Sequence, residues 1–148
     1  MWVASLLLIL VCLLWRTVGG EVYQAPIFAF AVVHALLQLF GVGLIARSVR
    51  TIDALELAGI RPGRPPTATA LQVTGPYRLV RHPLYLGWML VVFGPSHLTG
   101  DRLAFAVISS TYLVVAIPWE ERLLEDTFGA AYARYKRQVR WRVIPGVY

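Results

Sequence analysis

Four long apolar stretches alternate with polar segments along the chain. They cover residues 2–18, 26–46, 84–98 and 103–119. The second has 21 residues, about 31 Å as a helix, and matches a hydrocarbon core of about 30 Å. Because lipid supplies no hydrogen-bond partners to the backbone, we expect each stretch to be a transmembrane helix. In the third stretch, Gly94-Pro95 predicts a kink or an early end.

Two other interpretations of these stretches are less favoured. A soluble bundle needs a polar stripe on each helix, and residues 6–14 and 29–33 have none. A removable signal peptide at residues 2–18 needs a positively charged beginning, which the chain lacks. We therefore predict a single all-α domain over residues 1–148, an integral membrane bundle of four transmembrane helices.

The last segment, residues 120–148, is predicted to be a cytosolic tail with an amphipathic helix. Its apolar residues recur at spacings of 4, 4, 3 and 4, which place them on one face of a helix: Leu124, Phe128, Tyr132, Tyr135 and Val139. Such a helix lies on lipid headgroups or folds back over the membrane domain.

Composition and charge favour a membrane protein. Hydrophobic residues make up 57% and charged residues 15%, with a mean hydropathy of +0.61. Soluble domains usually have about 45–50% apolar residues and about 25% charged residues. The net charge is +6, but the 13 Arg and one Lys flank apolar stretches, which favours lipid headgroups over nucleic acid as the partner. Twelve of these 14 lie in residues 47–82 or in the tail, so both segments and both chain ends are predicted to be cytoplasmic.

Candidate chemistry gathers at the cytoplasmic ends of the third and fourth stretches. Pro83 suits a first helical turn, and His82 falls at or beside the N-cap, next to Arg81. Together with free backbone N–H groups they could hold an anionic group. The alternative is that the arginine anchors to headgroups and the histidine only caps. Glu120 and Glu121 follow the fourth stretch; they point about 100° apart on a helix, so at most one faces the bundle. Their alternative role is to cap the tail helix or to lie in solvent.

Polar and small residues inside the second stretch have a packing interpretation. His34 and Gln38 share one helix face, and an interhelical hydrogen bond is favoured over a functional role. Gly41 and Gly43 are interpreted as helix-packing positions. The chain has no His/Cys cluster with metal-ligand spacing, so no metal is expected. It also lacks dinucleotide, Walker A and zinc-protease motifs, which excludes Rossmann-type enzymes and kinases.

The segment Gly75-Pro-Tyr-Arg-Leu-Val-Arg-His-Pro-Leu-Tyr-Leu-Gly87 resembles the signature of the isoprenylcysteine carboxyl methyltransferase and phospholipid methyltransferase superfamily. A second block matches the superfamily in order and spacing: Glu120-Glu121, Phe128-Gly129, Tyr132, Tyr135, Val139 and Pro145. Both blocks lie in the C-terminal half of the chain, whereas the first two apolar stretches agree only in hydropathy.

The resemblance implies an integral membrane methyltransferase that uses S-adenosylmethionine without a Rossmann fold. It places the cofactor in a cytosol-facing pocket. Carried over by position, the cofactor-binding residues are Leu71, Gln72, Tyr77, His82, Pro83, Leu84, Tyr85, Glu120 and Glu121. Arg81 and His82 are the candidate catalytic residues, because an arginine can hold the cofactor's carboxylate and a histidine can take a proton from a thiol or amine.

One departure bears on the methyl acceptor. Prenylcysteine-specific members resemble each other in having an arginine four residues before the glutamate, where this chain has Ala116. We therefore predict a lipophilic or small-molecule acceptor without naming it. The alternatives are a non-catalytic membrane scaffold or subunit that kept the fold and, less favoured, a membrane reductase.

Overall fold

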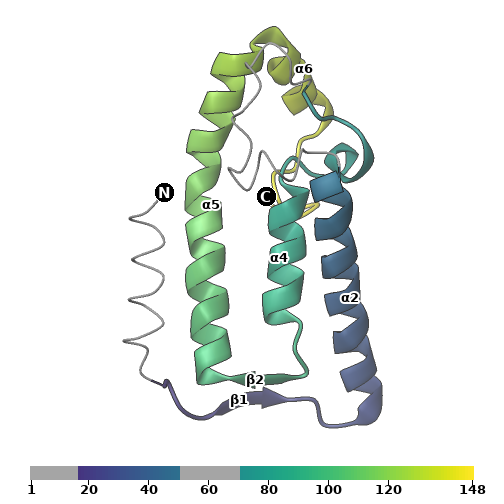
Figure 1. Cartoon of the computed structure of the whole chain (residues 1–148), viewed down its shortest axis with the longest axis vertical. Helices are drawn as coiled ribbons and strands as arrows, with labels where there is room; N and C mark the ends of the chain where they lie inside the picture. Colours follow the sequence, from purple (N-terminus) through teal and green to yellow (C-terminus); the bar gives the residue numbers. More distant parts are fainter. Residues whose placement is uncertain (1–16, 51–70) are drawn as a thin grey trace.

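The computed structural model describes residues 17–50 and 71–148. Most of the described chain is helical: α2 (Phe28–Arg50), the 3₁₀ helix η2 (Gly75–Arg78), α4 (Pro83–Phe93), α5 (Gly100–Phe128) and α6 (Ala130–Gln138). Two short strands, β1 (Glu21–Gln24) and β2 (His97–Thr99), lie at one end, and α6 lies at the other (Figure 1). The first predicted membrane helix, residues 2–18, falls almost entirely outside the described residues.

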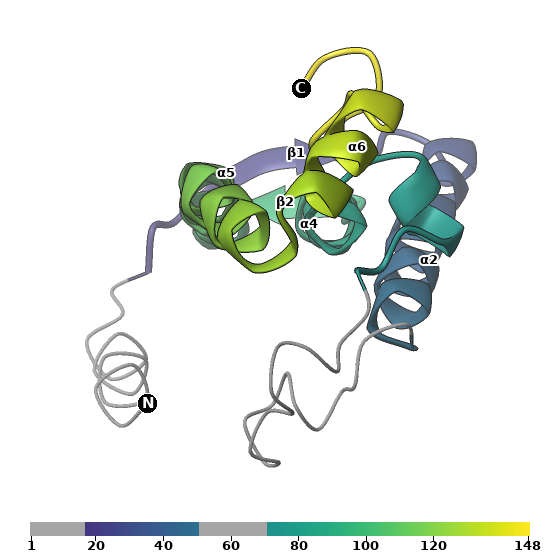
Figure 2. The ribbon, with the colours of Figure 1, turned by 90° about the horizontal axis from the view of Figure 1, so that it is seen from above.

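The three long helices stand side by side, with α4 between α2 and α5 (Figure 2). The closest approach of α2 to α4 is at two glycines. A Cβ added to Gly41 would come within 2.8 Å of the Gly87 carbonyl oxygen, so neither position leaves room for a side chain. The predicted packing role of Gly41 is confirmed. Gly43 has no such contact among residues 17–50 and 71–148, so its packing role stays a prediction.

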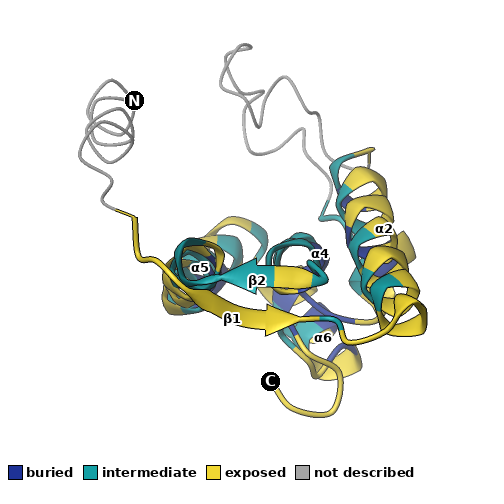
Figure 3. Cartoon of the chain, turned by 90° about the horizontal axis from the view of Figure 1, so that it is seen from below, coloured by how far each residue is buried: buried dark blue, intermediate teal, exposed yellow. Residues whose placement is uncertain are grey.

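Two described helices are long and apolar enough to cross a membrane, namely α2 and α5. Only 6% and 11% of their most apolar windows are buried, whereas the core helix of a soluble protein is mostly buried. Figure 3 shows how much of α2 is exposed. α4 is apolar but has only 11 residues, and it ends at Gly94. The early end predicted from Gly94-Pro95 is therefore confirmed, and four spans remain a prediction.

The boundary between the fourth stretch and the tail differs from the prediction. α5 runs past residue 119, through Pro118, and ends only at Phe128. A proline removes a single backbone hydrogen bond, and a long helix tolerates that loss. The break comes instead at Gly129, whose φ of 49° is in a region that L side chains rarely adopt. The predicted apolar face nevertheless packs as one cluster, with Tyr132, Tyr135 and Val139 at its centre.

The described chain is mostly helical, as predicted, and two short strands are an element that the all-α prediction did not include. β1 and β2 pair antiparallel, and further backbone bonds flank the pairing, from Ala25 N–H to the Ser96 carbonyl and from Gly100 N–H to the Gly20 carbonyl. Chain segments that leave helices need new partners for their backbone groups, and here they find each other. Near the sheet, two side chains of α2 contact backbone carbonyl groups at the end of α4. His34 Nδ1 lies 2.9 Å from the Gly94 carbonyl oxygen, and Gln38 donates to the Val91 carbonyl. The predicted interhelical hydrogen bonds are therefore confirmed.

Candidate functional site

The signature segment folds into a tight loop that leads into α4. Gly75 has a φ of 61°, and the next three residues complete η2. The Tyr135 hydroxyl on α6 donates to the Tyr77 carbonyl oxygen at 2.8 Å, which fixes the loop against the amphipathic helix. His82 is the N-cap of α4, as predicted, and Pro83 begins the helix. The His82 side chain makes no capping hydrogen bond, so its ring is directed elsewhere.

The segment after α6 pairs with the end of this loop. Arg81 N–H donates to the Trp141 carbonyl at 2.9 Å, and His82 N–H donates to the Arg142 carbonyl at 2.7 Å. The Arg81 side chain adds two bonds, from Nη1 to the Val139 and Arg140 carbonyl oxygens. Residues almost 60 positions apart in the sequence are thereby held together at the backbone.

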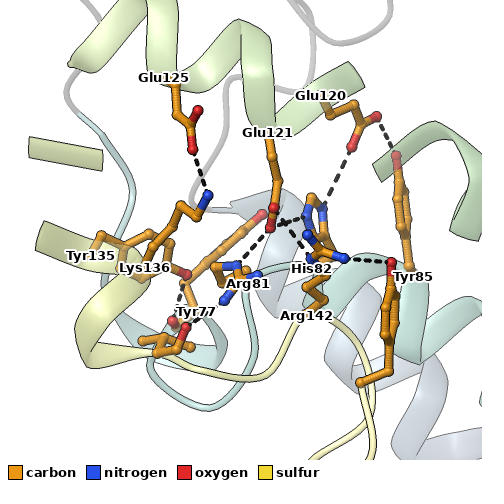
Figure 4. A network of polar contacts seen from close by, with 12 residues as sticks. Tyr77, Arg81, His82, Tyr85, Glu120, Glu121, Glu125, Tyr135, Lys136 and Arg142 are labelled. Carbon is orange, nitrogen blue, oxygen red and sulfur yellow. Dashed lines mark hydrogen bonds and ion pairs between the residues drawn. The ribbon is translucent and has the colours of Figure 1, made fainter. Parts of the chain in front are cut away.

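A buried carboxylate lies at the centre of the polar contacts (Figure 4). Glu121 belongs to α5, and its side chain is 4% exposed. Its Oε1 accepts from Arg81 Nε at 2.7 Å, and its Oε2 lies 3.3 Å from Arg142 Nε. His82 Nε2 is 3.5 Å from Oε1. Two guanidinium groups thus compensate the burial of this charge.

The neighbouring Glu120 has a different environment. Its side chain is 45% exposed, and it accepts a short hydrogen bond from the Tyr85 hydroxyl. Its Oε2 lies 3.5 Å from His82 Nδ1. The rings of His82 and Tyr85 are stacked, with centroids 5.3 Å apart. The imidazole therefore lies between two carboxylates, one buried and one open.

These side chains border a cavity of about 450 Å³, within the range of ligand-binding pockets. It is lined by Leu71, Gln72, Tyr77, Arg81, His82, Pro83, Leu84, Tyr85, Glu120, Leu123, Leu124, Phe128, Tyr132 and Tyr135. Eight of the nine positions carried over from the resemblance are in this lining. Glu121 is not, because it is buried behind the lining against the two arginines. The two glutamates thus point in different directions, as expected of neighbours on a helix, and Glu120 is the one that lines the cavity.

Several lining residues were not among the predicted site residues. Four of them belong to the amphipathic face predicted from the tail: Leu124, Phe128, Tyr132 and Tyr135. The periodicity placed them on one face, but only the turn at Gly129 directs that face at the loop. Burial raises the pKa of the Tyr132 and Tyr135 phenols, so both stay neutral at physiological pH. Arg142 was also missed, because an arginine in a basic tail gives no sign of a buried partner.

Arg81 lines the cavity, but its Nε and Nη1 atoms bind protein groups. In this arrangement the residue joins the loop, α5 and the segment after α6. A direct contact with a ligand carboxylate stays a prediction. No group of three or more His, Cys, Asp or Glu suited to a metal occurs among residues 17–50 and 71–148.

The chemistry of the lining suits an organic cation. Glu120 offers a carboxylate, Tyr77 and Tyr85 offer aromatic rings that attract positive charge, and Leu71, Leu124 and Phe128 form an apolar wall. S-adenosylmethionine combines a sulfonium, an amino group and a flat adenine ring. The donor set therefore fits this cofactor.

Comparisons with known proteins agree with the resemblance seen in the sequence. Curated relatives include methanethiol S-methyltransferase 1 of Bradyrhizobium diazoefficiens, 31% identical over 92% of this chain and 50% of the relative. The methanethiol S-methyltransferase of Mycobacterium tuberculosis is 32% identical over 92% of this chain and 58% of the relative. Protein-S-isoprenylcysteine O-methyltransferase A of Arabidopsis thaliana is 35% identical over 44% of this chain and 34% of the relative.

The chain thus spans about half the length of the methanethiol methyltransferases that it matches. No solved structure matches it significantly. The phospholipid methyltransferase family matches residues 30–131, which include most of α2 and all of α4, α5 and the signature loop. The chain therefore belongs to the phospholipid methyltransferase family.

Proposed function

We propose that the chain is a membrane methyltransferase that uses S-adenosylmethionine and methylates a small thiol. The observation that carries this proposal is the cavity between α4, α5 and α6, in which a carboxylate, two tyrosine rings and a histidine converge. Family membership supports the reaction class. The cavity volume supports a ligand of cofactor size.

The cofactor is assigned to the cavity lining. Glu120 pairs with its amino group or ribose hydroxyls, while Tyr77 and Tyr85 lie where aromatic faces can stabilise a sulfonium, an attraction of about 0.5–2 kcal/mol. When bound, S-adenosylmethionine supplies an electrophilic methyl group on sulfur. The cavity residues hold it in position and keep water away, which accounts for much of the rate of an in-line displacement.

A thiol acceptor follows from the relatives and from Ala116. The relatives that cover 92% of this chain are named methanethiol S-methyltransferases, whereas the isoprenylcysteine enzyme covers 44%. The position of the predicted substrate arginine is occupied by Ala116, which has no charge to meet a prenylcysteine carboxylate. Methanethiol is therefore the first acceptor to test.

A thiol must lose its proton to become a good nucleophile. His82 is the proposed base, because its ring borders the cavity between Glu120 and Glu121 and can keep the proton next to a carboxylate. As the new sulfur–carbon bond forms and the old one breaks, the proton remains on the imidazole. Release of that proton to solvent passes the half-exposed Glu120 side chain.

We place the cavity on the cytoplasmic side. Arg47, Arg50 and Arg78 lie at the same end of the helices as α6, whereas Arg102 lies near the sheet. This distribution follows the positive-inside rule. Both chain ends are assigned to the cytoplasm on the same basis.

Calorimetric titration of the purified protein with S-adenosylmethionine tests the first step. We expect binding to wild type and a loss of roughly tenfold or more in Glu120→Gln, because a charge-assisted hydrogen bond is replaced by a neutral one. The matched control is Glu125→Gln, one turn further along α5, whose exposed carboxylate pairs with Lys136. Absence of binding to wild type would overturn the proposal.

Headspace gas chromatography for dimethyl sulfide, with methanethiol as acceptor, tests the second step. We expect product with wild type and little with His82→Ala. Binding of the cofactor without product on methanethiol, on a prenylcysteine analogue or on a lipid extract would favour the non-catalytic scaffold.

A further inference from the structure

The segment after α6 is folded into a compact hook, residues 139–148. Val143 N–H and Ile144 N–H donate to the Tyr148 carbonyl at 2.8 and 3.0 Å, and Tyr148 N–H donates back to the Ile144 carbonyl. The Val143 side chain is fully buried. These bonds close the hook on itself while residues 141 and 142 pair with the signature loop.

Arg142 connects the hook to the site in two ways. Its carbonyl oxygen accepts from His82 N–H at 2.7 Å, and its Nε lies 3.3 Å from Glu121 Oε2. The guanidinium is itself held by Tyr148, whose hydroxyl accepts from Nη1 at 2.8 Å and whose ring centroid is 5.1 Å from Cζ. Figure 4 shows Arg142 on the hook side of Glu121, with His82 between the two glutamates.

The contact between Arg142 and Glu121 affects His82, because the imidazole is surrounded by charged groups. The groups that face the imidazole or its carboxylate partners are Glu120 and Glu121 of α5, Tyr85 of α4, Arg81 of the loop, Arg142 of the hook and Tyr132 of α6. Arg81 is tied to Oε1 and to two carbonyl groups. Arg142 is the cation on Oε2. Without Arg142, a cation would hold the carboxylate at Oε1 alone, which leaves the group free to turn about that contact and to move relative to His82 Nε2.

We propose that Arg142 is a positioning residue, which acts through Glu121 to hold the His82 ring in the cavity. The inference rests on the proposed function for its effect on turnover. Its structural part, the dependence of the His82 ring on Arg142, can be tested without activity.

The kinetic test compares Arg142→Gln and Arg142→Lys with the matched control Arg137→Gln, which removes an exposed charge from α6. We expect Arg142→Gln to lower kcat about tenfold or more, because small displacements of a reacting group are costly. Cofactor Kd and acceptor KM should stay within about twofold. Lysine at position 142 should restore most of the activity, and Arg137→Gln should equal wild type. A uniform loss of binding and turnover in Arg142→Gln, not restored by lysine, would overturn the proposal.

A double-mutant cycle tests the route through Glu121. In a Glu121→Gln background, Arg142→Gln should have little further effect on kcat, because coupled residues are not additive. An equal loss in both backgrounds would contradict the route. Tyr148→Phe provides a milder variant that keeps the fold and removes the hydroxyl bond to Arg142. We expect Tyr148→Phe to lower kcat less than Arg142→Gln does. An unchanged kcat would contradict a role of Tyr148 in holding the Arg142 guanidinium.

Nuclear magnetic resonance of protein with ¹⁵N-labelled histidine rings provides the test that needs no activity. The His82 ring signals are those missing from a His82→Gln variant. They should shift in Arg142→Gln, return toward wild type in Arg142→Lys and stay in place in Arg137→Gln. Unmoved signals in Arg142→Gln would overturn the inference, whether or not wild type transfers a methyl group. Moved signals with an inactive wild type would mean that the proposed function alone has failed.

Discussion

The two ends of the molecule each contain a carboxylate in contact with a basic side chain, but in opposite environments. At the cavity end, the Glu121 and Arg81 side chains are 4% and 7% exposed. At the sheet end, Glu21 and His97 pair at 3.0 Å with side chains 64% and 46% exposed. The first pair is buried among protein groups, while the second is open to solvent.

This difference in burial indicates which charge contacts stabilise the fold and which contribute little to its stability. A buried charge is tolerated only when its partners are complete, so removing one partner is severe. An exposed pair contributes little, because solvent replaces whatever is lost. The sheet end is held instead by backbone bonds between β1 and β2, which no single side-chain change removes.

The largest effect is expected from Glu121→Ala. It leaves the Arg81 guanidinium buried without its carboxylate, and we expect a loss of about 3–5 kcal/mol in the free energy of unfolding. Unfolding in detergent, followed by circular dichroism, measures it. Glu125→Ala on the same helix is the control. A loss below about 1 kcal/mol would mean that the buried pair at the cavity end contributes no more stability than the exposed contact at the sheet end.

Gly41→Ala should cause the second largest loss of stability. It changes the contact between α2 and α4, the two helices that run from the sheet end to the cavity end. The new methyl group would meet the Gly87 carbonyl oxygen at 2.8 Å and Leu90 Cβ at 2.9 Å, and overpacking of this kind costs about 1–3 kcal/mol. Gly43→Ala on the same helix is the matched control. Its methyl group meets no atom of the described residues within 4 Å, so the substitution should be neutral or slightly stabilising. Equal thermal unfolding of the two variants would refute the close approach.

Tyr135→Phe should cost about 0.5–1.5 kcal/mol of stability. It removes the hydroxyl that donates to the Tyr77 carbonyl and leaves that oxygen of the signature loop without this donor. The loss should be accompanied by faster hydrogen exchange of loop amides. Tyr112→Phe, on an exposed surface of α5, is the control and should leave both measurements unchanged.

The smallest effect is expected from His97→Gln at the sheet end. The contact with Glu21 is exposed, so its loss should change the free energy of unfolding by no more than about 0.5 kcal/mol. Added salt should reduce even that difference, since it screens exposed charges. A change above about 1 kcal/mol that persists in high salt would show that the sheet end depends on this pair.

The sequence predicted well whatever depends on neighbours along the chain. The apolar stretch at residues 26–46 corresponds to α2, and the early end at Gly94 was correct. The spacing of Tyr132, Tyr135 and Val139 identified a face that packs as one cluster. The end of α5 was misplaced by nine residues because the apolar stretch stops at residue 119, whereas the helix continues through the charged residues that follow and ends at Phe128.

The sequence by itself determined the apolar helices and the amphipathic face of the tail, because hydrophobic periodicity is local, and its resemblance to the methyltransferase superfamily supplied the eight predicted positions that line the cavity. Only the tertiary structure decided which glutamate faces the cavity, that β1 meets β2, and that Arg142 reaches Glu121. Each of these contacts joins segments far apart in the chain. No local pattern carries such a contact, since it forms only after helix packing has brought the two segments together.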